Sequence, residues 1–157
     1  MEDQIISLLK TIIPGLVVAI VTSLITVRLS IRRFYEEKWW EKKYDAYTGI
    51  LQSLHHFKKY ALKHFDSYVS HKKISEDAKK ELESDWKKHS KEFEMLHDMA
   101  LFQLSEEANR ILDEYREAKN EAKKCEDIFE WIDKDADAAI SCLKKLSLEA
   151  KNDLKIK

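Results

Sequence analysis

Residues that interrupt helices are scarce in this chain of 157 residues, which has only two glycines and one proline. Pro14 and Gly15 are adjacent, so residues 32–157 contain no proline and a single glycine, Gly49. A segment so poor in both residues, and rich in Lys, Glu, Ala and Leu, is typical of helices joined by short turns. We therefore expect an all-α fold.

Motifs that carry catalysis are also missing. The chain contains no Gly-x-Ser-x-Gly, no glycine-rich phosphate loop and no His-Glu-x-x-His. Cys125 and Cys142 fit no zinc or redox spacing and are expected to be small apolar residues of the core. Glu94-x-x-His97 has the spacing of di-iron bundles but lacks a second copy, so we expect both side chains to face solvent. We predict no enzyme activity, no cofactor and no metal site.

Neither sign of charge is in excess, because 28 Lys and Arg stand against 29 Asp and Glu. The two signs are nevertheless separated along the chain. Residues 1–75 carry 12 basic and 7 acidic side chains, whereas residues 76–157 carry 16 and 22. Phosphate contacts need a basic face, so the acidic second half argues against nucleic-acid binding. No pattern indicates a small-molecule substrate.

One long apolar run dominates the N-terminal part. Residues 11–27 (TIIPGLVVAIVTSLITV) have no charge, and the run extends back to Ile5 with one interruption at Lys10. As a helix, residues 5–27 would cover about 34 Å, enough for a hydrocarbon core of about 30 Å. We predict a transmembrane anchor over residues 1–31. A buried core helix and a cleaved signal peptide are alternatives, but the acidic start and the lack of a small-residue cleavage site disfavour a signal peptide.

Basic residues flank this run unequally. Lys10 precedes it, and six basic residues follow within 16 positions: Arg28, Arg32, Arg33, Lys38, Lys42 and Lys43. The positive-inside rule then predicts an outside N-terminus and a cytoplasmic C-terminal domain, in a single-pass protein of the inner (plasma) membrane. The side chains expected at the membrane interface are Lys10, Arg28, Arg32, Arg33, Phe34 and Tyr35.

Apolar residues recur every three or four positions through residues 32–157, which we expect to form one cytoplasmic domain. The spacing predicts helices over 32–69, 76–103, 106–132 and 135–155, and Ser75 and Ser105 have the features of N-caps. Whether 106–155 is one helix or two stays open, with a break capped near Asp133 favoured by length. Narrow apolar seams favour an antiparallel three- or four-helix bundle or coiled coil.

The first of these helices has an apolar stripe with one misfit, Lys58; its members are Trp40, Tyr44, Tyr47, Leu51, Leu54, Ala61, Phe65 and Tyr68. We expect Trp40 in the bundle core and Trp39, on another face, as a candidate partner contact. Gly49 within the helix would let a neighbouring helix approach closely. His89 lies on the apolar stripe of the next helix and is expected to be partly buried.

The order of an apolar anchor, then RRFYEEKWWEKKYDAY, then helices ending in AKNDL resembles small bacterial single-pass membrane-anchored helical proteins of unassigned function. The resemblance implies a bacterial inner-membrane protein and no mechanism. We expect an interaction or scaffolding module, with the lipid bilayer and a protein partner or a second copy as its partners. Alternatives are a membrane-acting effector, of the toxin or phage-defence type, that oligomerises through its single span, and a signalling component.

Overall fold

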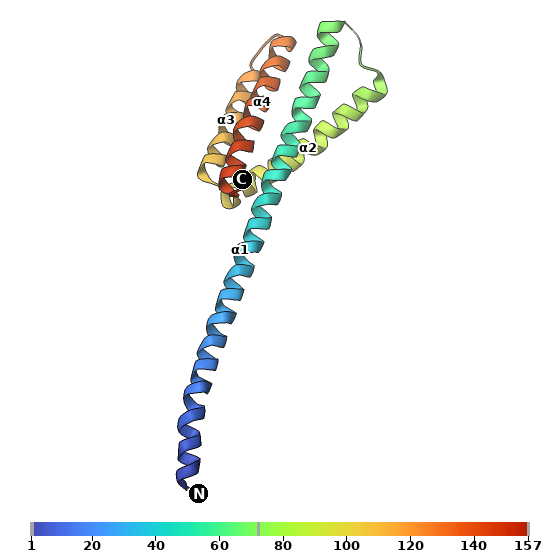
Figure 1. The fold of residues 1–157 in the computed structure, drawn as a ribbon. Coiled ribbons are helices and arrows are strands. Elements are labelled where there is room, and N and C mark those ends of the chain that lie inside the picture. Colours follow the sequence, from blue (N-terminus) through green and yellow to red (C-terminus); the bar gives the residue numbers. More distant parts are fainter. Residues whose placement is uncertain (1, 72, 157) are drawn as a thin grey trace. The chain divides into compact units, whose positions relative to one another are not determined.

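The computed structural model describes residues 2–71 and 73–156, and the side chains from residue 13 onward within those ranges. It contains four helices, α1 (Glu2–Ser70), α2 (Glu76–Gln103), α3 (Glu106–Ala122) and α4 (Ile128–Asp153), and no strand in those ranges (Figure 1). The predicted all-α fold is confirmed. The chain divides into two compact units, Met1–Glu41 and Lys42–Lys157.

The first unit is the N-terminal part of α1, which continues through Pro14. An 18-residue window of this helix has a mean hydropathy of 1.9, and none of the window is buried. Among the described residues, α1 is the one helix long and apolar enough to cross a membrane. The hydroxyl of Thr26 donates to the Thr22 carbonyl at 2.8 Å, so this polar group is satisfied within its own helix.

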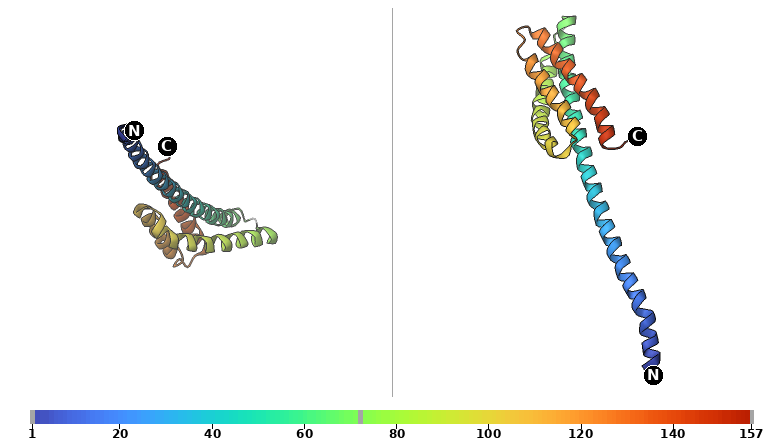
Figure 2. Two further views of the ribbon diagram at one scale, coloured as in Figure 1. Left: turned by 90° about the horizontal axis from the view of Figure 1, so that it is seen from below. Right: turned by 90° about the vertical axis from the view of Figure 1, so that its left-hand side faces the viewer.

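The second unit is an antiparallel four-helix bundle. Tyr47 near the start of this part of α1 meets Asp153 at the end of α4, whereas Phe65 further along α1 stacks on Phe129 at the start of α4. Antiparallel pairing also holds α3 against α4, and Figures 1 and 2 show these two helices side by side. All four helices contribute to one main core.

The face of α1 that enters this core differs from the predicted stripe at two places, each shifted by one residue. Ile50 and Phe57 are fully buried, in place of Leu51 and Lys58. Because Phe57 is the residue that packs in the core, Lys58 lies outside the core face and is no longer a misfit in the apolar stripe. The shared members Tyr47, Leu54 and Ala61 are buried as predicted.

Trp40 is 43% exposed, so its predicted place in the core is wrong. The reason is its position, since Trp40 precedes the second unit, which begins at Lys42. Tyr44, one turn further on, is also exposed. The apolar spacing therefore continues through two residues that are not buried.

Gly49 permits a close approach of α2, as expected. A Cβ atom built on Gly49 would lie 2.7 Å from Leu96 Cδ1, well inside van der Waals contact. The missing side chain therefore makes room for Leu96, which packs against the core from α2.

The predicted starts of α2 and α3 are confirmed. Ser75 and Ser105 are N-caps, whose side chains accept hydrogen bonds from Ala78 N at 3.3 Å and Ala108 N at 3.0 Å. α2 has the predicted bounds, 76–103.

Two helices, not one, form the C-terminal part, and the predicted bounds 106–132 and 135–155 are wrong at the break. α3 ends at Ala122, where tight backbone bonds such as Lys124 N to Glu121 O (3.0 Å) close the turn. Asp127 caps α4 by accepting from Phe129 N at 3.2 Å. Cys125 therefore lies in the turn rather than in a helical stripe. Asp135, expected near a cap, lies inside α4 and is buried.

Candidate functional site

The predicted membrane-interface residues lie on α1 within the first unit, apart from Lys10, whose side chain is outside the described residues. Phe34 and Tyr35 are exposed and meet edge to face, with ring centroids 6.0 Å apart. Arg32 pairs with Glu36 at 2.8 Å, and Arg28 and Arg33 are exposed on the same helix. This segment combines exposed aromatic rings with exposed cations, and its place at a membrane interface stays a prediction.

Trp39, the candidate partner contact, is 41% exposed. Trp40 has nearly the same exposure, so burial does not distinguish the two indoles. The role of Trp39 as a partner contact stays a prediction, which a binding experiment can test.

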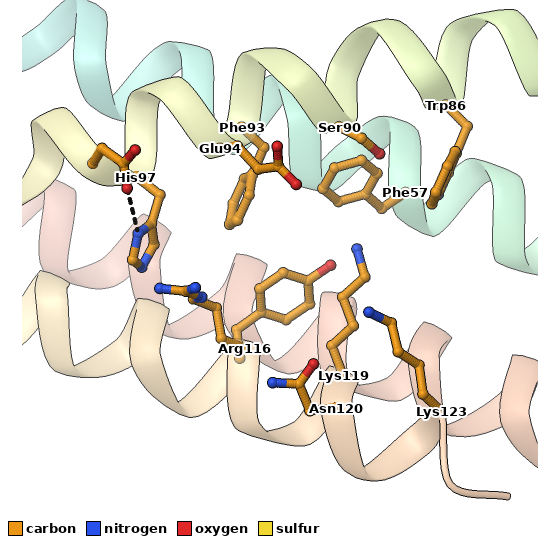
Figure 3. A pocket seen from close by; sticks show the side chains of 12 residues that line it. Phe57, Trp86, Ser90, Phe93, Glu94, His97, Arg116, Lys119, Asn120 and Lys123 are labelled. Carbon is orange, nitrogen blue, oxygen red and sulfur yellow. Dashed lines mark ion pairs between the residues drawn. The ribbon is translucent and has the colours of Figure 1, made fainter.

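A pocket of about 450 Å³ opens in the second unit between α2 and α3 (Figure 3). Its apolar lining consists of four aromatic rings: Phe57 of α1, Trp86 and Phe93 of α2, and Tyr115 of α3. Three cations line it at intervals of about one helical turn: Arg116 and Lys119 of α3, and Lys123, the C-cap residue of α3. The sequence offered no motif for this pocket, because its lining residues come from three helices.

Lys119 is the cation that lies deepest in this pocket. Its Nζ is 4.6 Å from the centroid of Phe57 and 5.8 Å from those of Trp86 and Tyr115. Ring faces attract cations through their quadrupole. Burial among these rings lowers the pKa of Lys119, which the negative charge of Asp135 partly counteracts. Within the part of the chain that the structure describes, no carboxylate lies within ion-pair distance of Lys119.

Two buried hydroxyl groups at the same pocket have no hydrogen-bond partner among the described residues, namely Tyr115 Oη and Ser90 Oγ. Tyr115 is only 3% exposed, and burial raises the pKa of its phenol. Buried polar groups in folded proteins are nearly always paired with protein or water. These two groups therefore leave hydrogen-bonding capacity at the pocket wall.

The prediction that His97 faces solvent is wrong, because this side chain is buried. Its ring nitrogens lie 4.0 Å from Asp98 and 3.6 Å from Asp113, while Glu94 is exposed. α2 turns His97 toward α3, whereas Glu94, three residues earlier, lies at the open rim of the pocket. The local spacing alone did not reveal that α3 covers this side of α2.

Two further histidines form a stacked pair between α1 and α2. The rings of His56 and His89 are parallel within 16° and their centroids are 3.7 Å apart. His89 is buried, as predicted for a residue on the apolar stripe. Burial lowers the pKa of His56, and the positive charge that His89 can carry lowers it further.

The outer face of α2 carries an exposed apolar row. Met95, Met99 and Phe102 follow one another at helical spacing, and Phe102 is 75% exposed. Rows of this kind, with contacts at i, i+4 and i+7, are used by helices that bind a groove on another protein.

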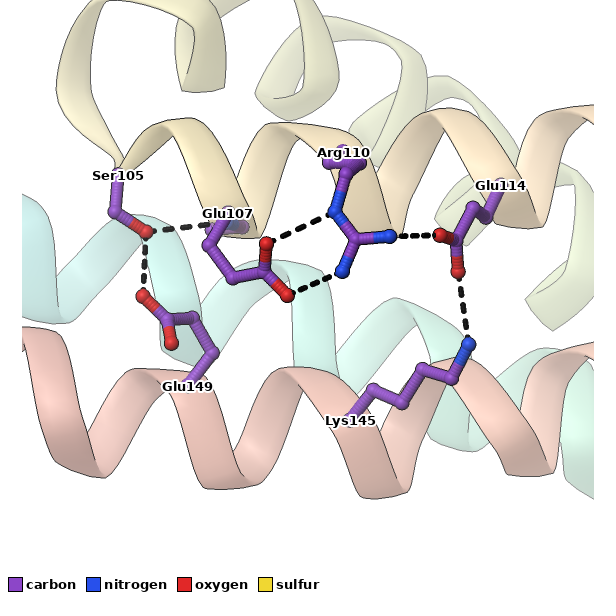
Figure 4. A network of polar contacts seen from close by, with 7 residues as sticks. Ser105, Glu107, Arg110, Glu114, Lys145 and Glu149 are labelled. Carbon is purple, nitrogen blue, oxygen red and sulfur yellow. Dashed lines mark hydrogen bonds and ion pairs between the residues drawn. The ribbon is translucent and has the colours of Figure 1, made fainter.

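A chain of polar contacts links α3 to α4 (Figure 4). Arg110 binds Glu107 at 2.5 Å and also binds Glu114, which accepts from Lys145 of α4 at 2.8 Å. Ser105 donates to Glu149 at 2.6 Å. The contacts of Lys145 with Glu114 and of Ser105 with Glu149 join the two helices, so we assign these groups a structural role.

The residues whose side chains are described include no group of three or more His, Cys, Asp and Glu that could hold a metal ion. Comparisons of the chain with protein-family models, with curated proteins and with solved structures find no match.

Proposed function

We propose that this protein is a membrane-anchored interaction module without catalytic activity, in which the first unit holds the helical bundle at a bilayer. The observation that carries this proposal is the row of large apolar side chains on α1 from Ile13 to Val27, all exposed. Burying apolar surface contributes about 25 cal/mol per Å², so a helix with such a surface needs an apolar environment. A bilayer supplies one over the whole circumference of the helix.

The orientation that we propose has the bundle in the cytoplasm of a bacterium, at the inner membrane. The asymmetry of basic residues around the span supports it. The exposed cations Arg28, Arg32 and Arg33 and the rings of Phe34 and Tyr35 would then contact the headgroups of the inner leaflet.

The partner that we propose is another protein chain, bound through exposed apolar side chains. Met95, Met99 and Phe102 on α2 offer one such surface, and Trp39 on α1 offers another. Exposed apolar surface on a folded domain commonly marks an interaction site.

Fractionation of cells tests the anchor and its orientation. The intact chain should remain in the membrane pellet after an alkaline carbonate wash, and protease added to sealed cells should leave the bundle undigested. The mass of the purified protein should include the apolar segment, which excludes a cleaved signal peptide. Release by carbonate, or digestion of the bundle from outside, contradicts the proposal.

Photo-crosslinking in cells tests the interaction surfaces. A photoreactive amino acid at Met99 or at Trp39 should give a crosslinked product of defined mass, identified by mass spectrometry as a partner or a second copy. The control is the same amino acid at Lys144, which is exposed on α4. Equal products from all three positions, or none from Met99 and Trp39, would contradict a specific interface.

A further inference from the structure

We propose that the pocket between α2 and α3 binds a small organic anion, whose negative group lies against Lys119 and whose flat apolar body packs among the aromatic rings. This binding site is independent of the membrane anchor and of the interaction surfaces. Its volume of about 450 Å³ is in the range of ligand pockets in folded proteins.

Three cations and two acids line the pocket, so its lining carries a net positive charge. The buried carboxylate of Asp135, which is not part of the lining, offsets part of the charge of Lys119. Lys119 is half-buried, and Figure 3 shows its side chain pointing from α3 toward Phe57. The two acids of the lining, Glu94 and Asp98, are both exposed, and the side chain of Asp98 is 86% exposed. Water therefore screens the acids at the rim, while the cation lies where screening is weaker.

The ammonium group of Lys119 has three N–H donors, and ring faces do not replace hydrogen-bond acceptors. An anion in the pocket would supply these acceptors and a full opposite charge. Arg116 of α3 and its C-cap residue Lys123, both exposed, can reach a carboxylate or a phosphate from the rim.

The body of the ligand follows from the other lining groups. Trp86, Phe93 and Phe57 present rings to the pocket, and aromatic rings pack well against flat apolar groups. Tyr115 Oη and Ser90 Oγ, both buried and unpaired among the described residues, would accept or donate one hydrogen bond each to a polar group on that body. An aromatic carboxylate and a nucleoside monophosphate share this chemistry.

The test uses the full chain in phosphatidylcholine nanodiscs, labelled with 5-fluorotryptophan. The ¹⁹F resonance of Trp86, assigned with the Trp86→Phe variant, reports on the pocket. The probes are 2-naphthoate and adenosine monophosphate, with the neutral counterparts 2-naphthamide and adenosine, and empty nanodiscs correct for partitioning. We expect an anionic probe to shift the resonance in a saturable way below about 10 mM, and its neutral counterpart to bind at least about tenfold more weakly.

Variants show whether Lys119 carries the binding. Lys119→Met should lower the affinity for the anionic probe by about tenfold or more, whereas Lys119→Arg should keep most of that affinity. Lys144→Met removes one exposed charge elsewhere and should have no effect. Circular dichroism verifies that each variant is folded, and removal of a desolvated charge is not expected to unfold the bundle.

Each outcome decides the proposal. Binding of 2-naphthoate alone identifies a carboxylate ligand, binding of adenosine monophosphate alone identifies a phosphate ligand, and binding of both supports the general class. The proposal is overturned by no saturable shift with either anion, by equal binding of the neutral probes, or by equal affinity of wild type and Lys119→Met.

Discussion

The phenol of Tyr47 on α1 donates a hydrogen bond of 2.8 Å to Asp153 Oδ2 in the last turn of α4. Lys43 Nζ lies 2.8 Å from the other carboxylate oxygen, so Asp153 joins two side chains of α1. Both charged groups are mostly buried. Burial raises the pKa of Tyr47, so its phenol stays a donor at neutral pH. This contact fixes the end of the bundle at which the second unit begins.

Tyr47→Phe should lower the free energy of unfolding by about 1.5 kcal/mol, because a hydrogen bond to a charged group is lost while the ring remains. Thermal unfolding of the full chain in detergent, followed by circular dichroism, measures the change. The matched control is Tyr68→Phe, at an exposed tyrosine, with an expected change within about 0.5 kcal/mol. Equal effects of the two substitutions would contradict a specific role for the Tyr47 hydroxyl.

Gly49 and Leu96 should be energetically coupled. Gly49→Ala gains about 1 kcal/mol of helix propensity but forces Leu96 Cδ1 to move, so we expect little net change in the native background. In the Leu96→Ala background the new methyl group at position 49 has room, so Gly49→Ala should raise the free energy of unfolding by about 1 kcal/mol. The double-mutant cycle from unfolding curves measures this coupling. An identical effect of Gly49→Ala in both backgrounds would show that the close approach has no energetic consequence.

Acid should destabilise the packing of α1 on α2 through the stacked histidines. The folded-state pKa of His56 is lowered by burial and by His89, so the unfolded chain binds a proton more readily. The stabilising contribution of neutral His56 is therefore complete above the pKa of histidine in the unfolded chain, about 6.5, and it decreases as the pH falls below that value. Asp85 from α2 opposes this shift, while His55 and Lys59 from α1 add to it.

His56→Phe tests this pH dependence, because phenylalanine can stack on His89 without titrating. Unfolding curves at about pH 7.5 and about pH 5.5 should show a smaller loss of stability for the variant than for the native chain. The pKa of His64 is also lowered by burial, so His64→Phe should reduce the acid sensitivity in the same direction. If the variant with both His56→Phe and His64→Phe loses as much stability in acid as the native chain, these histidines are not the source of the acid sensitivity.

The two serine caps should differ in strength. Ser75→Ala removes one exposed cap and should cost about 1 kcal/mol. Ser105→Ala removes a cap and also the donor to Glu149, so a cost of about 2 kcal/mol is expected. Glu149→Gln retains an acceptor for Ser105 and should cost less than Ser105→Ala. A larger loss from Ser75→Ala, measured by thermal unfolding, would reverse this ranking.

The two cysteines should react at different rates. Cys142 is buried, and burial raises the pKa of its thiol to about 12, so little thiolate is present. Cys125 lies partly exposed in the turn before α4. In the folded chain a maleimide should modify Cys125 alone, and denaturant should expose the second site, as counted by mass spectrometry. Rapid labelling of Cys142 in the native protein would show that the core opens readily.

Local patterns in the chain were sufficient to predict several elements. The near absence of glycine and proline predicted the all-α fold, and Ser75 and Ser105 predicted two helix starts, because N-capping depends on a side chain and the next turn only. The position of the break, at residues 123–127 instead of near Asp133, was not predicted, since the apolar spacing stays in phase across it. The pocket around Lys119 was also missed, because no local motif joins residues from three helices.

The sequence by itself determined the apolar run of α1, the helical character of the remainder and two of its caps, since these depend on composition and on neighbours within one turn. Only the tertiary structure decided that Ile50 and Phe57 enter the core, that Trp40 stays outside it, and that His97 turns toward α3. A helix offers several faces of similar apolar character, and the choice among them depends on which helices pack against it.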